Sequence, residues 1–133
     1  MKSDFITQSL ELVAELCGDP TPLVYARLFA EHPELEALFT RDTSGAVRGQ
    51  MLAQVIDIFF DHVGRGAYTT NFIRAEQVNH ENLGVPPQVF GTFFRTVMEC
   101  FREVAGDQWT PEMDAAWREL VAELEDLTAR VGV

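Results

Sequence analysis

Apolar residues recur at spacings of three and four along almost the whole chain, and no stretch alternates apolar and polar residues as a half-buried strand does. Residues 111–131 show the pattern best, because their apolar side chains form one stripe: Met113, Trp117, Leu120, Val121, Leu124, Leu127 and Val131. Thr110 is a suitable N-cap, and Pro111 stands at the first helical position, where its missing N–H costs nothing. We therefore expect a long amphipathic helix that packs on one side.

The same periodicity predicts further helices: about 3–17, about 20–31, 46–63 and the segment that starts at Pro86 and Pro87. The last two have wide apolar surfaces, which favour burial. Residues 68–82 predict a weaker helix because they are polar and contain few strong helix formers, and Pro33 opens a short turn. The chain is therefore expected to be all-α, with six or seven helices joined by short corners.

Size and composition predict one domain over residues 1–133, large enough to bury a core without disulfides or metals. No apolar run approaches the roughly 20 residues that cross a bilayer, and the start of the chain lacks a signal-peptide pattern. We therefore expect a cytoplasmic protein. Cys17 and Cys100 both lie in apolar helical patterns, which favours buried free thiols over a disulfide.

The net charge is −11, from 10 basic and 21 acidic residues. Such a surface repels phosphate backbones and anionic lipids, so the charge argues against nucleic acid and membranes as partners. The chain is expected to be a monomer or a weak homodimer.

One set of residues keeps a regular order along the chain. Tyr25 and Phe29 share a helical face, and Phe39 follows Pro33 by six residues. The next residues of the series are separated by four, three and four positions: Arg48, Leu52, Val55 and Phe59. His80 lies 32 residues after Arg48. A lone histidine beside a helix end is usually only solvated, so His80 matters because distant residues agree with it.

These features together resemble the globin family. The stretch "YARLFAEHPELEALF" is similar to the family's second helix and the corner after it, and "NHENLGVPPQVF" is similar to its proximal-histidine stretch. The stretch "GDQWTPEMDAAW" resembles the turn into the last helix. The resemblance covers nearly the whole chain and is strongest to bacterial single-domain globins, the globin domain of flavohaemoglobins and neuroglobin-like chains.

The resemblance implies a globin-like fold around a haem b pocket. His80 would be the axial ligand of the haem iron, and its second ring nitrogen would donate to a backbone carbonyl about one turn earlier. Phe39 would stack on the haem. Other positions fall where the family lines its pocket, although each also reads as a plain core residue: Phe29, Leu52, Val55, Leu83, Val85, Phe90 and Val97.

Tyr25 and Arg48 would control the distal side of that pocket. The Tyr25 hydroxyl would donate to the iron-bound ligand, or else reach solvent or a backbone carbonyl. Arg48 departs from the histidine or glutamine that the family commonly has there, and it would either pair with the haem propionates or stay in solvent. Arg41 is a second candidate cation for the propionates. Gly49 would let two helices cross closely.

The resemblance implies reversible binding of a diatomic gas at pentacoordinate haem iron, with O₂ first and CO or NO as further ligands. The alternatives are nitric oxide dioxygenation with a separate reductase, since we expect no reductase domain on this chain, and a gas-sensing or regulatory role. In flavohaemoglobins a proximal tyrosine and glutamate make the histidine more electron-donating. Phe90 stands at that tyrosine's position and no acid clearly replaces the glutamate, so weak proximal electron donation is expected.

Overall fold

The computed structural model describes residues 2–64, 69–82 and 87–131. All secondary structure in these residues is helical, which confirms the predicted all-α class. The helices are α1 (Lys2–Cys17), α2 (Thr21–Glu31), α3 (Ala46–Val63), α4 (Thr69–Asn82), α5 (Pro87–Ala105) and α6 (Pro111–Val131), with short 3₁₀ helices η1 (Pro33–Phe39) and η2 (Gly106–Gln108). These bounds agree with the predicted segments to within a few residues.

Local hydrogen bonds explain where two of the helices begin. Thr110 Oγ1 accepts a hydrogen bond from the Met113 backbone N–H at 3.1 Å, so the predicted N-cap of α6 is confirmed. At the start of α2, Asp19 Oδ1 accepts from the backbone N–H of Thr21 at 3.0 Å and from its hydroxyl at 2.6 Å. The side chains before these helices therefore satisfy N–H groups that lack a partner within the helix.

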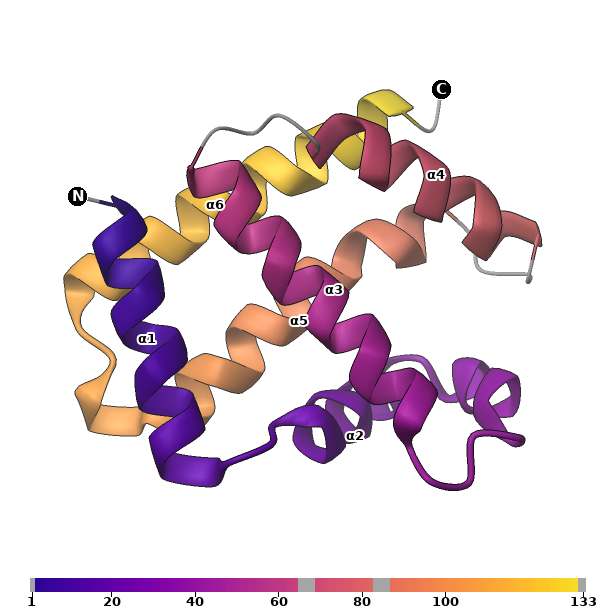
Figure 1. Ribbon diagram of the computed structural model, residues 1–133, viewed down its shortest axis with the longest axis horizontal. Helices are drawn as coiled ribbons and strands as arrows, with labels where there is room; N and C mark the ends of the chain where they lie inside the picture. Colours follow the sequence, from indigo (N-terminus) through magenta and orange to yellow (C-terminus); the bar gives the residue numbers. More distant parts are fainter. Residues whose placement is uncertain (1, 65–68, 83–86, 132–133) are drawn as a thin grey trace.

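Helix α5 runs through the middle of the molecule, and α1, α2 and α6 pack against it (Figure 1). Helix α3 crosses α5 steeply in this view, and α4 lies along the part of α6 near the C-terminus (Figure 1). The chain reaches α3 from α2 through η1 and the loop after it. Helices α2, α3, α4 and α5 thus come together at one end of the molecule.

The solid part of the core surrounds Trp117, which is fully buried. Its ring contacts Phe59 (centroids 4.9 Å apart), Phe101 (5.9 Å) and Trp109 (6.1 Å). The indole N–H donates to Ser9 Oγ at 2.6 Å, and the Ser9 hydroxyl donates to the Ile6 carbonyl at 2.7 Å. The large ring of Trp117 is therefore buried without leaving its polar atom unpaired.

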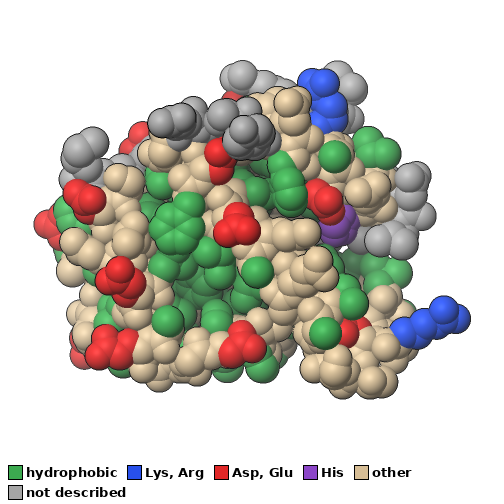
Figure 2. All heavy atoms as spheres, viewed as in Figure 1, with side chains coloured by type: hydrophobic (Ala, Val, Ile, Leu, Met, Phe, Trp, Pro, Cys, Tyr) green, Lys and Arg blue, Asp and Glu red, His purple; other side chains and the backbone are tan. Residues whose placement is uncertain are grey.

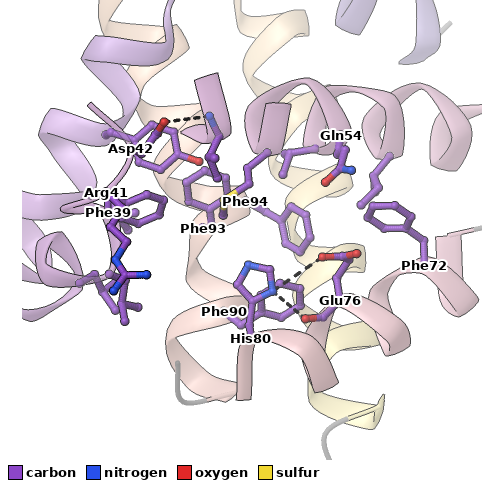
Figure 3. A pocket seen from close by; sticks show the side chains of 18 residues that line it. Phe39, Arg41, Asp42, Gln54, Phe72, Glu76, His80, Phe90, Phe93 and Phe94 are labelled. Atoms are coloured by element: carbon purple, nitrogen blue, oxygen red, sulfur yellow. Dashed lines mark hydrogen bonds and ion pairs between the residues drawn. The ribbon is translucent and has the colours of Figure 1, made fainter. Parts of the chain in front are cut away.

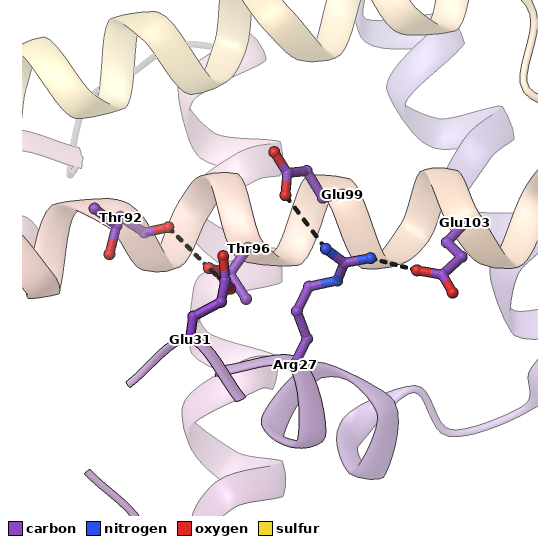
Figure 4. A network of polar contacts seen from close by, with 6 residues as sticks. All are labelled: Arg27, Glu31, Thr92, Thr96, Glu99 and Glu103. Carbon is purple, nitrogen blue, oxygen red and sulfur yellow. Dashed lines mark hydrogen bonds and ion pairs between the residues drawn. The ribbon is translucent and has the colours of Figure 1, made fainter. Parts of the chain in front are cut away.

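A polar network fixes α2 against α5 (Figure 4). Arg27 forms ion pairs with Glu99 and Glu103, and the Thr96 hydroxyl donates to Glu31 at 3.1 Å. Arg27 and Glu31 are four residues apart and lie on one face of α2, so these contacts join that face to α5. Tyr25, on the same helix, is thereby kept on the buried side.

Acidic side chains outnumber basic ones on the face of the molecule drawn in Figure 2. Acidic side chains are spread over the face in Figure 2, and apolar side chains form the floor of a hollow between them.

Cys17 and Cys100 are both free thiols, and burial raises the pKa of Cys100 to about 11. In the described part of the chain, no helix combines the length and the apolar character needed to span a bilayer.

Candidate functional site

A cavity of about 310 Å³ lies between α2, η1 and α3 on one side and α4 and α5 on the other. This volume is within the range of small-molecule sites. Most of its wall is apolar or aromatic, and Figure 3 shows the side chains around it. The described lining is Tyr25, Leu28, Leu35, Leu38, Phe39, Arg41, Asp42, Val47, Met51, Gln54, Val55, Ile58, Phe72, Glu76, His80, Phe90, Phe93 and Phe94.

His80 reaches the cavity from the last turn of α4. Its Nδ1 lies 2.7 Å from the carbonyl oxygen of Glu76, one turn earlier, so the predicted hydrogen bond is present. A carbonyl oxygen only accepts, so Nδ1 carries a proton, and in the neutral ring the lone pair is then on Nε2. The Phe90 ring packs beside the imidazole with centroids 5.0 Å apart. The ring is thus held in one tautomer with an available ligand atom.

Tyr25 lies in the cavity wall formed by α2 and is 2% exposed. The rings of Phe29, Phe39 and Phe93 surround it at centroid distances of 5.9, 5.5 and 5.7 Å. Among the described residues the hydroxyl has no hydrogen-bond partner. Burial raises the Tyr25 pKa far above its usual range, although the nearby Arg48 charge lowers it slightly. The hydroxyl therefore stays protonated and is an unused donor inside the protein.

Helix α3 lines the cavity with only part of the expected set of side chains. The α3 side chains that line the cavity are Val47, Met51, Gln54, Val55 and Ile58. Leu52 is 2% exposed and packs in the core instead. The apolar surface of this helix is wide enough that its periodicity alone does not fix which residues face a ligand. Met51 and Gln54 are thus site residues that the spacing argument did not select.

Arg48 is held outside this cavity by Asp42. The Arg48 guanidinium donates through Nε to the Asp42 carboxylate at 3.0 Å and through Nη2 to the Asp42 carbonyl at 2.7 Å. The Asp42 carboxylate also accepts from the backbone N–H groups of Val47 at 3.1 Å and Arg48 at 3.0 Å. Asp42 therefore caps α3, and it supplies the anion that offsets the Arg48 charge near the helix N-terminus.

Burial tends to raise the Asp42 pKa, but the hydrogen bonds from the Arg48 and Val47 backbones and from the Arg48 side chain outweigh it and leave the pKa lowered. Arg48 lines a second cavity of about 500 Å³, and Tyr25 and Phe39 line both this cavity and the first. This ion pair was not among the settings expected for Arg48, which were the haem propionates and solvent.

The other expected pocket residues divide into three groups. Val55, Phe39 and Phe90 line the first cavity with His80 and Tyr25. Phe29 lines the second cavity, and Val97 is fully buried in the core. Leu83 and Val85 lie outside the described residues. The expectation for Gly49 was wrong, because a methyl group built there would meet nothing within 4 Å, so no close helix crossing requires the glycine.

The cavity suits a flat, largely apolar group that carries a metal ion and acidic substituents. In the neutral imidazole the His80 Nε2 could ligate a metal ion, and the unpaired Tyr25 hydroxyl could donate a hydrogen bond to a small ligand. Aromatic rings form much of the remaining wall. Among the described lining residues Arg41 is the one Lys or Arg, and the neighbouring Asp42 carboxylate is already paired with Arg48. The residues present therefore fit a haem.

Comparison with known proteins gives the same assignment. A family model described as Globin matches residues 23–127. The chain is similar to a flavohemoprotein of Rhizobium meliloti (27% identity over 108 residues, 79% of this chain and 26% of that protein). It is also similar to a flavohemoprotein of Halalkalibacterium halodurans (24% over 127 residues, 95% and 31%) and to one of Bordetella pertussis (25% over 104 residues, 77% and 26%).

The matched part of these relatives is a minor part of each, since the chain spans 26% to 31% of their length. The family model, by contrast, covers most of this chain: most of α2, all of α3 to α5 and most of α6, the helices that form the cavity and the core beneath it. On this match and on the helical architecture, the chain belongs to the globin family.

Proposed function

We propose that this globin holds haem b in the cavity between α3 and α4 and reversibly binds a diatomic gas there, O₂ first. Globins generally bind haem, and through it small gas ligands. The observation that carries the proposal is that His80 and Tyr25, from different helices, line one apolar cavity, each with a polar atom that no described residue engages. The haem iron would supply the open coordination position for the gas.

His80 would bind the iron through Nε2. The hydrogen bond from Nδ1 to the Glu76 carbonyl fixes the tautomer that this requires and limits rotation of the ring. Phe90 restricts the ring further from one side. The protein thus orients this ligand before any cofactor arrives.

Tyr25 would donate a hydrogen bond to the gas. A neutral phenol in a dry pocket interacts strongly with a ligand that carries partial negative charge, as O₂ does when iron transfers electron density to it. CO is less polar and gains less. The rings of Phe29, Phe39 and Phe93 hold the phenol in place and keep water away.

Arg41 would pair with the haem carboxylates. It lines the cavity and is exposed, so it meets these charged groups where they reach solvent. Arg48 is unsuited to this role while Asp42 holds it.

Nitric oxide dioxygenation with a separate reductase is the second candidate, because the relatives named above are flavohemoproteins. The same tyrosine serves either reaction. Steady-state NO consumption with a generic reductase separates them: turnover sustained over many equivalents supports the dioxygenase, and loss of a single equivalent per haem supports the carrier.

Tyr25→Phe tests the gas-binding proposal. The substitution removes the hydroxyl and keeps the ring, so we expect O₂ dissociation to speed up by about ten-fold or more, which corresponds to about 1.4 kcal/mol per decade. CO dissociation, measured in the same preparation, serves as the control and should change little. If both rates stay within about two-fold of wild type, Tyr25 is not the donor.

A further inference from the structure

The proton-bearing nitrogen of His80 faces two acceptors from a single residue. Nδ1 lies 2.7 Å from the Glu76 carbonyl oxygen and 3.8 Å from the Glu76 carboxylate oxygen Oε2 (Figure 3). The two residues are four apart on α4, which puts their side chains on the same face of the helix. The first acceptor was expected from the sequence, and the second was not.

The environment of Glu76 favours a direct effect on the imidazole. The His80 and Glu76 side chains are only 17% and 28% exposed, so solvent screens their interaction incompletely. The cavity lining has one other described carboxylate, Asp42, and that group is committed to Arg48 and the start of α3. No Lys or Arg of the described chain forms an ion pair with Glu76. Its charge therefore acts mainly on His80.

We propose that the Glu76 carboxylate is a positioning residue that makes His80 a stronger electron donor to haem iron, an inference that rests on the proposed function. A negative charge beside the N–H polarises that bond and raises electron density at Nε2, as carboxylate–histidine–metal arrangements do. A more electron-rich axial ligand stabilises ferric over ferrous iron and lowers the reduction potential. This acid replaces, from within α4, the proximal acid whose absence was expected from the sequence.

Electron donation through His80 and the hydrogen bond from Tyr25 would both stabilise a bound gas. Greater electron donation from the His80 side increases the negative charge on a bound diatomic gas, and the Tyr25 hydroxyl on the opposite side stabilises that charge. Glu76 thus strengthens the hydrogen bond that Tyr25 makes without touching the gas. Phe90 offers no hydrogen bond to the imidazole, so Glu76 carries this effect alone among the described neighbours.

Glu76→Gln isolates the charge, because the backbone carbonyl that orients the ring stays in place. We expect the variant to bind haem, to show a raised Fe(III)/Fe(II) midpoint potential by redox titration, and to show a lower iron–histidine stretching frequency in the ferrous resonance Raman spectrum. Glu76→Asp keeps the charge and should stay closer to wild type than the glutamine variant. Glu11→Gln, an exposed change on α1, is the control for net charge and should shift neither quantity.

Unchanged potential and stretching frequency in a haem-loaded Glu76→Gln protein would overturn the inference and leave the proposed function standing. A Glu11→Gln shift of equal size would also overturn it, because the effect would then be one of overall charge. If the wild-type protein takes up no haem, the proposed function fails and this inference fails with it.

Discussion

Trp117 and Tyr25 are both buried aromatic residues with a polar atom, but their surroundings differ in a way that separates stability from function. Trp117 is packed by three aromatic rings, and Ser9 accepts its N–H. Tyr25 is also packed by three rings, yet its hydroxyl has no partner in the described chain and borders an open cavity of about 310 Å³. Phe94 stands between the two regions, near Phe59 on one side and Phe90 on the other.

The two residues differ in the free-energy cost of burying their polar atoms. A satisfied group such as the Trp117 indole costs little and fixes how α1 and α6 pack. An unsatisfied hydroxyl such as that of Tyr25 costs about 1–3 kcal/mol, and a ligand that accepts its hydrogen bond removes the cost. The packed core around Trp117 therefore has its polar atom paired, whereas the wall of the cavity contains a buried hydroxyl without a partner among the described residues.

The largest difference in stability between two variants is expected on α3, which contributes side chains both to the packed core around Trp117 and to the cavity. Leu52→Ala should destabilise the cofactor-free protein by about 2–5 kcal/mol, because the side chain is fully packed. Met51→Ala should cost clearly less, because Met51 is only half-buried and borders the cavity. Urea unfolding of both variants measures the two costs. A Met51 cost equal to or above that of Leu52 would contradict the assigned face of the helix.

A smaller difference in stability is expected from removing the partner of the Trp117 N–H and from removing the Tyr25 hydroxyl. Ser9→Ala removes the acceptor of the Trp117 N–H and should destabilise the protein by about 1–3 kcal/mol. Tyr25→Phe removes a hydroxyl that has no partner, so the cofactor-free protein should be unchanged or slightly more stable. Thermal unfolding of both variants without haem makes the comparison. A marked loss of stability in Tyr25→Phe would mean that the hydroxyl already has a structural partner.

The smallest effect should come from the Asp42 cap at the edge of the cavity. Its pKa is lowered in the folded state, so its stabilising contribution is fully present above the ordinary carboxyl pKa and is lost as the pH falls through the lowered value. Asp42→Asn should therefore lower the melting temperature at pH 7, and the difference from wild type should shrink in acid. A difference that stays constant between neutral pH and about pH 2 would show that the charge is not what stabilises the cap.

The helices could be predicted from the sequence because apolar spacing and proline positions mark them directly. Pro111 and Thr110 located the start of α6, and even the polar segment that forms α4 was expected as a helix. The bounds of α3 were also found. Which of its side chains line the cavity was only partly predicted: Val55 was expected there but Met51 and Gln54 were not, because the apolar surface of the helix is wide.

Some residues of the site could be predicted from the sequence, and some of their contacts could not. The histidine, the corner phenylalanine and the tyrosine followed from the resemblance, and the structure brings His80, Phe39 and Tyr25 to one cavity. The pairing of Asp42 with Arg48 depends on the path of the loop before α3, which no residue spacing fixes. Glu76 was within reach of the sequence, since a separation of four residues from His80 on a helix puts the two on one face.

Haem binding in the cavity through His80 can be measured by titrating the purified wild-type protein with haem and recording the visible spectra of its ferric, ferrous and CO-bound forms. We expect a Soret band that saturates at one haem per chain and is lost in His80→Ala after gel filtration. The band should be retained in His32→Ala, a change at a partly exposed histidine next to Glu34. A wild-type protein that shows no Soret band after titration, or a His80→Ala variant whose spectrum is unchanged, would contradict haem binding through His80.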